Sequence, residues 1–254
     1  MKIAEHIDAL EEAGRALADA AEKAGPDAEV PTCPEWRIRD LLRHTAKVHR
    51  WATDLVVERR TSPLPPAGGP ELDGDALLAY YREGHTALVA ALRTTPETLE
   101  CWTFMPASSP LAFWARRQAH ETTVHRADAE SALAAGPGPV DPAVAADGID
   151  ELLRGFHGQD RSRVRTPQPR TLRMRTTDTG DTWTVRLSAD EPPRTEREDA
   201  AAATGSAAAE TPDAELSGPA DRLYLTLWNR LPVEAVTLTG DEGLARLWRE
   251  TSGI

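Results

Sequence analysis

The chain has 254 residues and a formal net charge of −12, from 29 basic and 41 acidic side chains. This length suffices for one large domain or two small ones with a buried core. The acidic balance argues against a nucleic-acid-binding protein, because phosphate contacts need a basic stripe. No apolar run approaches the roughly 18–20 residues that cross a bilayer, and Lys2, Glu5 and Asp8 place charges where a signal peptide needs an apolar segment. The two cysteines, Cys33 and Cys101, are far apart and have no metal-type spacing. From these features together we expect a soluble cytoplasmic protein with reduced thiols and no nucleic-acid or membrane partner.

The first 135 residues are predicted to form four amphipathic helices, at residues 3–23, 36–59, 73–93 and 110–135. Residues 32–35 (Thr-Cys-Pro-Glu) have the form of a capping box, with Thr32 as the N-cap of the second helix and Glu35 reaching back to it. Residues 62–70 are rich in proline and glycine and are expected to be a loop. Four such helices in succession indicate a four-helix bundle.

After residues 136–139 (Gly-Pro-Gly-Pro) the pattern changes to a mixture of helices and strands. Residues 141–156 look helical, and residues 172–176 and 183–187 alternate apolar and polar positions around Gly180-Asp181, which predicts a hairpin. The other elements expected are strands at 214–216 and 233–238, helices at 219–230 and 242–249, and a loop or frayed segment in the Ala-rich residues 200–210. We therefore predict an α+β protein, with a four-helix bundle over residues 1–138 and a small α+β domain over residues 139–254.

Polar side chains fall on the predicted core-facing stripes of two helices. In the second helix His44 lies on the apolar line, whereas His49 points elsewhere. In the fourth helix Glu121 and His125 are one turn apart and separated by about 40° around the axis, so both can reach one ion. Together with His44 they form a set of two histidines and one carboxylate with open coordination positions. This arrangement is typical of a catalytic metal centre.

Other interpretations of the histidines and cysteines compete with this one. His120 and Glu121 resemble the start of the H-E-x-x-H zinc-protease motif, but His125 is five residues from His120 and about 140° around the axis, so the two histidines cannot share a metal. A histidine on an apolar face is also often a hydrogen-bonded core residue, and a Glu–His pair four residues apart can simply stabilise its helix. His85, on the seam of the third helix, is a fourth ligand, a support for one, or a structural residue. We expect Cys33, at a helix start, to be structural.

Several short motifs are specific for one protein family. In the first half they are residues 30–36 (VPTCPEW), 39–42 (RDLL) with His44, 48–51 (VHRW), 101–104 (CWTF), 113–121 (FWARRQAHE) and 125–130 (HRADAE). In the second half they are residues 141–142 (DP), 146–151 (ADGIDE), 177–180 (TDTG), 218–221 (GPAD) and 227–230 (LWNR). In these motifs the chain resembles the mycothiol-dependent maleylpyruvate isomerase family, a branch of the DinB-like metal-binding bundles. The resemblance covers nearly the whole chain and is weakest over residues 62–70 and 192–210.

The resemblance implies a fold, a metal and a cofactor. The family's three metal ligands fall on His44, Glu121 and His125. The implied fold is a DinB-like bundle followed by an α+β domain similar to sterol-carrier-like modules. Zinc is the implied ion, although nickel or another first-row metal suits such a site. The implied cofactor is mycothiol, whose thiol loses its proton on binding a dication and then attacks an electrophilic small molecule. The reaction would be a maleylpyruvate-type cis–trans isomerisation or an S-transfer.

Cationic side chains are expected near the substrate and the cofactor. The candidates are Arg222 and Arg230 for catalysis and Arg116 and Arg117 for cofactor binding, with their individual roles left open. Gln118 and Asp128, one turn outside the metal pair, are expected to support the ligands. Two alternatives to an enzyme remain: a non-catalytic metal- and ligand-binding protein of the same fold, and a regulatory protein whose seam residues are only hydrogen-bonded. The expected assembly is a monomer or a homodimer.

Overall fold

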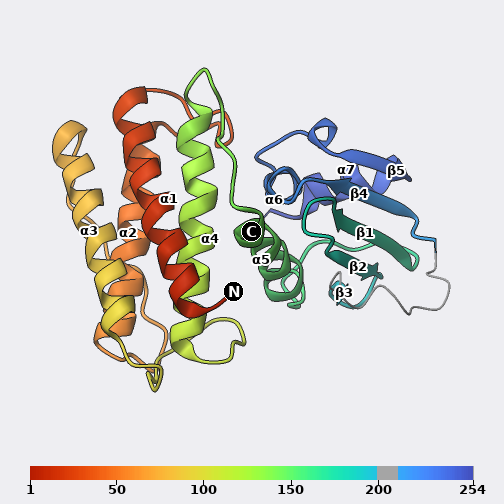
Figure 1. Cartoon of the computed structure of the whole chain (residues 1–254), viewed down its shortest axis with the longest axis horizontal. Helices are drawn as coiled ribbons and strands as arrows, with labels where there is room; N and C mark the ends of the chain where they lie inside the picture. Colours follow the sequence, from red (N-terminus) through yellow and green to blue (C-terminus); the bar gives the residue numbers. More distant parts are fainter. Residues whose placement is uncertain (199–210, 254) are drawn as a thin grey trace. The chain divides into compact units, whose positions relative to one another are not determined.

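The computed structural model describes residues 1–198 and 211–253, which divide into two compact units, Met1–Gly138 and Pro139–Ile254. The first unit consists of four long helices and the second of a sheet with helices (Figure 1). The predicted α+β fold class is therefore confirmed. The Ala-rich segment 200–210, predicted to be a loop or a frayed segment, lies outside the described residues. Within the described residues, no helix combines the length and apolarity that a membrane span needs.

The four helices of the first unit begin and end within a few residues of their predicted bounds. They are α1 (Ile3–Ala24), α2 (Ile38–Val57), α3 (Gly74–Thr94) and α4 (Pro110–Ser131). The side chain of Asp73 accepts a hydrogen bond from the first backbone N–H of α3. Ser109 caps α4 in a similar way, and Pro110 occupies the first helical position, where its missing N–H is no loss.

The start of α2 differs from the prediction. Its N-cap is Arg37, whose backbone N–H donates to Asp40 Oδ2 at 3.0 Å. Thr32 instead donates its hydroxyl proton to Asp128 Oδ1 on α4, at 2.6 Å. The capping-box prediction was wrong because the partner of Thr32 is 96 residues away in the sequence. Residues 31–35 form turns that an isolated antiparallel bridge between Glu29 and Arg37 closes, so the helix begins only after this bridge.

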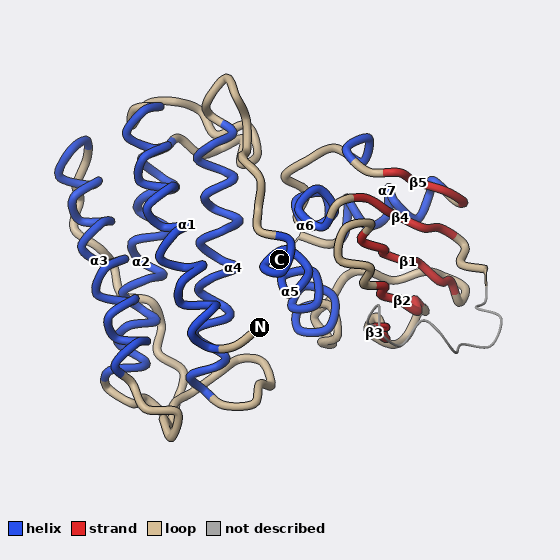
Figure 2. Tube along the Cα trace, in the orientation of Figure 1, coloured by secondary structure: helices blue, strands red, loops and turns tan. Residues whose placement is uncertain are grey.

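Helices α2 and α3 run parallel to each other. Arg39 at the start of α2 pairs with Asp73 at the start of α3, and Arg50 pairs with Glu83 about ten residues further along both helices. After α2 ends, the chain must therefore pass back along the length of the bundle before α3 begins. A tight turn is too short to span this distance. Residues 58–73, called the crossover below, make this return as a loop (Figure 2).

Helices α1 and α3 approach each other closely at Gly14. A Cβ at this position would lie 2.2 Å from His85 Nε2, so only glycine leaves room for the ring. In this space His85 Nε2 lies 3.0 Å from Leu10 O, and the Tyr81 hydroxyl donates to Gly14 O at 3.1 Å. His85 is thus bonded to the backbone of α1, which agrees with its structural interpretation.

The second unit contains one mixed sheet. Its helices are α5 (Pro142–Asp150), which continues as the π-helical turn η1 (Glu151–Phe156), α6 (Ala220–Leu227) and α7 (Glu242–Thr251). Its strands are β1 (Arg170–Thr176), β2 (Thr182–Leu187), β3 (Arg194–Glu198), β4 (Ala214–Gly218) and β5 (Thr237–Gly240). The strand order is β3-β2-β1-β4-β5, in which only β1 and β4 pair in parallel. The predicted hairpin around Gly180 is confirmed as β1 and β2.

Two details of this sheet differ from the prediction. The strand expected from residue 233 begins only at Thr237, because Val233–Ala235 form the 3-10 turn η2. The edge strand β3 was not predicted, because its sequence Arg-Thr-Glu-Arg-Glu has no apolar face for periodicity to detect. Its pairing with β2 is visible only in the folded sheet.

The motifs at residues 177–180 and 218–221 meet in the structure. The Asp178 carboxylate accepts a hydrogen bond from the Ala220 N–H at 2.9 Å, at the start of α6. The Thr177 N–H donates to Gly218 O, also at 2.9 Å. Asp178 therefore acts as a long-range cap that ties the hairpin turn to the helix.

Candidate metal centre

Three side chains that the sequence singles out come together between α2 and α4. They are His44 from α2 and Glu121 and His125 from α4, and one potential ligand atom from each lies within 4.8 Å of the other two. His44 Nε2 and His125 Nε2 each lie 3.2 Å from Glu121 Oε1. The two imidazole rings stand edge to face, with their centroids 4.9 Å apart.

This group fits a divalent first-row metal ion. Ligand atoms bound tetrahedrally at about 2.1 Å from one zinc ion lie about 3.4 Å apart, close to the two nitrogen–oxygen distances observed here. The His44 side chain is 37% exposed, so the group is open to solvent on that side. Three protein ligands with an open side are typical of a catalytic metal site, whereas structural zinc sites are closed by four.

His125 is oriented by a carboxylate behind it. Its Nδ1–H donates to Asp128 Oδ2 at 2.8 Å, and Thr32 donates to the other oxygen of Asp128. Because Nδ1 donates to Asp128, Nε2 is the ring nitrogen that faces Glu121, and it is the nitrogen that would bind a metal ion once the ion displaces its proton. Asp128 therefore contacts His125 as we expect of a residue that supports a metal ligand. The hydrogen bond from Thr32 connects Asp128 to the loop before α2.

The charges of the group are strongly coupled. Burial alone would raise the pKa of Glu121, but hydrogen bonds from His125 and His44 and the charge of Arg117 hold it well below its usual range. Burial alone would lower the pKa of His125, but its hydrogen bonds to Asp128 and Glu121 raise it to about 9. The carboxylate is therefore ionised at neutral pH, as a metal ligand must be.

The predicted cofactor-binding arginines have different environments. Arg117 is buried, and its Nη2 lies 3.2 Å from Glu121 Oε2, so it neutralises the oxygen that does not face the histidines. Arg116 is half-buried on the same helix. Gln118 is buried, and its Oε1 has no hydrogen-bond partner among the described residues. The roles expected of these three residues stay predictions.

The predicted catalytic arginines lie in the second unit. Arg222 is on α6, and Arg230 follows the end of that helix. Arg230 donates to Trp228 O at 2.8 Å. Their expected part in catalysis stays a prediction.

The burial of the two histidines on α2 is the reverse of the prediction. His49 is completely buried, with Nε2 2.9 Å from Thr122 Oγ1, whereas His44 is partly exposed. The prediction was wrong because it assumed one narrow apolar line. α2 packs against both α3 and α4, so its buried face is wide enough to include Thr45 and His49.

Sequence reasoning missed Trp36, which lies beside the metal centre. Its ring centroid is 5.0 Å from that of His44 and 6.1 Å from that of His125. The only sequence signal was a tryptophan in the loop just before a helix that carries a candidate ligand. The position of this loop depends on Thr32 and its hydrogen bond to α4.

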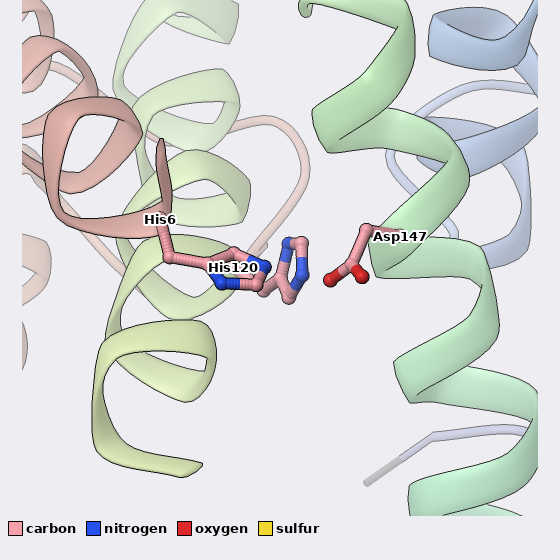
Figure 3. Close-up of side chains that lie close together, drawn as sticks. All are labelled: His6, His120 and Asp147. Carbon is pink, nitrogen blue, oxygen red and sulfur yellow. The ribbon is translucent and has the colours of Figure 1, made fainter. Parts of the chain in front are cut away.

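His120 does not join this group. Figure 3 shows its ring, from α4, beside that of His6, from α1; the two centroids are 5.9 Å apart and the planes meet at 78°. The helical geometry that excluded the H-E-x-x-H motif agrees with this position. Cys33, expected to be structural, packs partly buried against the apolar core of the bundle.

Comparison with known proteins gives matches along both units. A family model described as the mycothiol maleylpyruvate isomerase N-terminal domain matches residues 7–130, and the C-terminal domain model of that family matches residues 143–247. Two similar crystal structures are those of a mycothiol-dependent maleylpyruvate isomerase and of a histidine-to-alanine mutant, with TM-scores of 0.62 and 0.61. Each is 13% identical in sequence, with 94% of this chain and 93% of the other covered, so the likeness is one of fold. No curated protein matches the sequence.

Proposed function

Because the chain belongs to the mycothiol-dependent maleylpyruvate isomerase family, we propose that it is a metal-dependent enzyme that uses mycothiol as its nucleophile. The observation that carries this proposal is the convergence of His44, Glu121 and His125 on one point with one side open. The substrate is an electrophilic small molecule, and the reaction is a cis–trans isomerisation of the maleylpyruvate type. If the thiol adduct is released instead of losing the thiol again, the enzyme is an S-transferase.

Neither cysteine of the chain belongs to the group formed by His44, Glu121 and His125. A free thiol has a pKa of about 8.5 and is mostly protonated at neutral pH. Burial raises the pKa of Cys101 further, which makes its thiolate scarcer. A divalent ion held by the three side chains would lower the pKa of an incoming thiol and so provide the thiolate at neutral pH.

The residues of the bundle prepare the site for that chemistry. Glu121 supplies the negative charge that attracts a dication, and Arg117 stabilises its other oxygen in the buried surroundings. Asp128 keeps the His125 proton on Nδ1, away from the ion. Trp36 packs against both histidine rings. These roles require no movement of the helices.

The first test is the metal content of the purified wild-type protein and of two matched histidine variants. We expect about one equivalent of zinc or another divalent metal in the wild type and in His85→Ala, and loss of the metal in His44→Ala. His85→Ala is the control because this ring is bonded to α1 and lies outside the group. A wild type that takes up no metal after reloading would overturn the proposal.

The second test is thiol binding and turnover. Mycothiol added to the cobalt-substituted protein should produce a sulfur-to-metal charge-transfer band, and loss of a maleylpyruvate-type substrate should depend on the thiol. A trans product with the thiol recovered supports isomerisation, and a stable thioether supports S-transfer. Metal binding without any thiol-dependent reaction would contradict the enzyme and favour a metal- and ligand-binding protein of the same fold.

A further inference from the structure

A cavity of about 630 Å³ opens between α1 and α3. This volume is in the range of about 300–1,000 Å³ that is usual for small-molecule sites. The lining residues recur every three or four positions along both helices, so one stripe of each helix forms a wall and the cavity is a groove between them. No lining residue belongs to the crossover or to the candidate metal centre. The groove is therefore a separate place on the bundle.

Ion pairs between the two helices stand at the ends of this groove. At one end Arg82 of α3 lies 2.8 Å from Glu22 of α1. At the other end Arg93 of α3 lies 2.8 Å from Asp8 and 2.6 Å from Glu11. Eleven residues separate the two arginines, which is about 16 Å along the helix. The groove between the ion pairs is long enough for a small molecule.

The charges of the lining are already paired. The third cation of the lining, Arg15, pairs with Glu11 on its own helix. Every arginine of the lining thus has a carboxylate partner among the described residues, and a charged ligand would have to compete with these pairs. An uncharged ligand leaves them intact, so we expect the ligand to be neutral.

One polar ring lies in the wall of the groove. His85 is 5% exposed and lines the cavity. Its Nε2 lies 3.0 Å from Leu10 O, and because a carbonyl oxygen can only accept, Nε2 carries a proton. Burial lowers the pKa of His85, so the ring is neutral at neutral pH. A neutral ring with its proton on Nε2 has a bare lone pair on Nδ1.

This lone pair is available to a ligand. Among residues 1–198 and 211–253, Nδ1 of His85 has no hydrogen-bond partner. It is not sealed inside the core, in contrast to Nδ1 of His49, and the groove is where the His85 ring meets the surface. An acceptor in such a buried ring costs free energy while it lacks a donor. A ligand that donates one hydrogen bond there would remove this cost.

The walls beside His85 are small and apolar. Gly14 and Ala18 of α1 face the groove, and Val89 and Ala90 of α3 follow His85 by four and five residues. Small side chains on both helices leave a narrow space into which a flat ring fits. Eight residues, or about 12 Å of helix, separate His85 from Arg93. This stretch has room for two fused aromatic rings.

We propose that this groove binds a flat aromatic molecule that carries one hydroxyl group, which donates its proton to His85 Nδ1 while the rings lie against Val89 and Ala90. An aromatic hydroxyl has a pKa of about 10, so it is neutral and keeps its proton at neutral pH. The guanidinium planes of Arg15 and Arg93 at the rim can stack on an aromatic face, which favours an aromatic over an aliphatic body. The site does not depend on the metal or on the proposed function.

The first test follows the acceptor atom itself. The probe is 2-naphthol, and the control ligand is 2-methoxynaphthalene, which has the same rings but no proton to donate. The full chain is labelled with ¹⁵N-histidine, and the Nδ1 signal of His85 is assigned from its absence in His85→Ala. With 2-naphthol we expect a saturable shift of this signal to lower frequency, the direction in which a bare imidazole nitrogen moves on accepting a hydrogen bond. The signals of His157, in the second unit, should not change.

The second test blocks the groove. Ala90→Phe places a large ring in it, and Ala87→Phe is the matched control, because Ala87 is exposed on the same helix but lies outside the lining. We expect Ala90→Phe to lose the binding of 2-naphthol, measured by the fluorescence of the probe, and Ala87→Phe to bind like the wild type. The wild type should bind 2-methoxynaphthalene roughly fivefold or more weakly than 2-naphthol, since one hydrogen bond is lost.

Three results would overturn the proposal: an Nδ1 signal that does not shift, equal affinity for the two ligands, or full binding in Ala90→Phe. Binding of 2-naphthol should also persist after chelator treatment, and binding that requires the metal would contradict a separate site. The metal content of both phenylalanine variants should be that of the wild type. The metal and mycothiol tests of the proposed function are therefore independent of these results.

Discussion

Asp128 links His125 to the loop that precedes α2. One carboxylate oxygen accepts the Nδ1 proton of His125 at 2.8 Å, and the other accepts the hydroxyl proton of Thr32 at 2.6 Å. The same loop carries Trp36, which packs against His44 and His125. A single carboxylate therefore sets both the proton position of one candidate ligand and the placement of the side chain that covers it.

Replacing this carboxylate by an amide tests its role. In Asp128→Asn we expect the affinity for zinc to fall about 10–100-fold, the usual effect of losing such a support. An amide no longer offers two equivalent acceptors to His125 and Thr32. Competition with a chelator measures the affinity, and Thr32→Ser, which retains the hydroxyl, should bind zinc like the wild type. Unchanged affinity in Asp128→Asn would show that His125 needs no such orientation.

The contact between Gly14 and His85 predicts a steric effect on stability. Gly14→Ala gains about 1 kcal/mol of intrinsic helix propensity. A methyl group 2.2 Å from the His85 ring must displace it, at a cost of about 1–3 kcal/mol for an overpacked core. We expect the clash to dominate, so that urea unfolding shows a net loss of stability.

A double-mutant cycle separates this clash from other effects. In the His85→Ala background the ring is absent, and Gly14→Ala should then be neutral or stabilising. If Gly14→Ala destabilises both backgrounds equally, the cause is not the contact with His85. Metal content should be the same in all four proteins, because neither residue belongs to the metal centre.

His49 predicts a pH dependence of stability. Burial lowers the pKa of this histidine to about 3 in the folded state, against about 6.5 when unfolded. The unfolded chain therefore binds a proton that the folded chain excludes. The contribution of neutral His49 is fully present above about pH 6.5 and is lost progressively as the pH falls toward 3. His157, whose pKa burial lowers to about 4, acts in the same direction.

Substitution of His49 isolates its share of this dependence. We expect the free energy of unfolding of metal-free His49→Gln to fall less steeply between pH 6.5 and 4 than that of the metal-free wild type. Urea titrations at several pH values measure this slope. Equal slopes would mean that His49 is protonated in the folded state, which would contradict its burial against Thr122.

In the second unit, Asp178 predicts a capping effect. Asp178→Ala removes the acceptor for the first N–H of α6, and we expect a loss of about 1 kcal/mol in unfolding free energy. Asp178→Asn, which keeps one acceptor oxygen, should lose less. Asp190→Ala is the matched control, since this exposed aspartate has no ion pair or side-chain hydrogen bond within the described residues. Equal effects at positions 178 and 190 would contradict the capping role.

Periodicity in the sequence was sufficient for the helices, for the hairpin and for the three residues of the candidate metal centre. Each of these features depends on residues within one or two turns, or on strict alternation along one strand. Glu121 and His125 share one face of a single helix, so the helical repeat alone places them together. The apolar line of the second helix added His44, and the family resemblance implied the same three residues. The polar edge strand β3 had no such pattern, and it went unpredicted.

The α+β class, the order of most elements and the choice of His44, Glu121 and His125 follow from local patterns in the amino-acid sequence. The contacts of this group with residues distant in the sequence follow from the packing of the helices: Thr32 donates to Asp128, and Trp36 packs against the two histidines. The same packing buries His49 and sets α2 and α3 parallel. The physical reason is that helical periodicity tells which face of a helix is apolar, whereas the burial and partners of a polar side chain depend on the neighbouring helices that pack against that face.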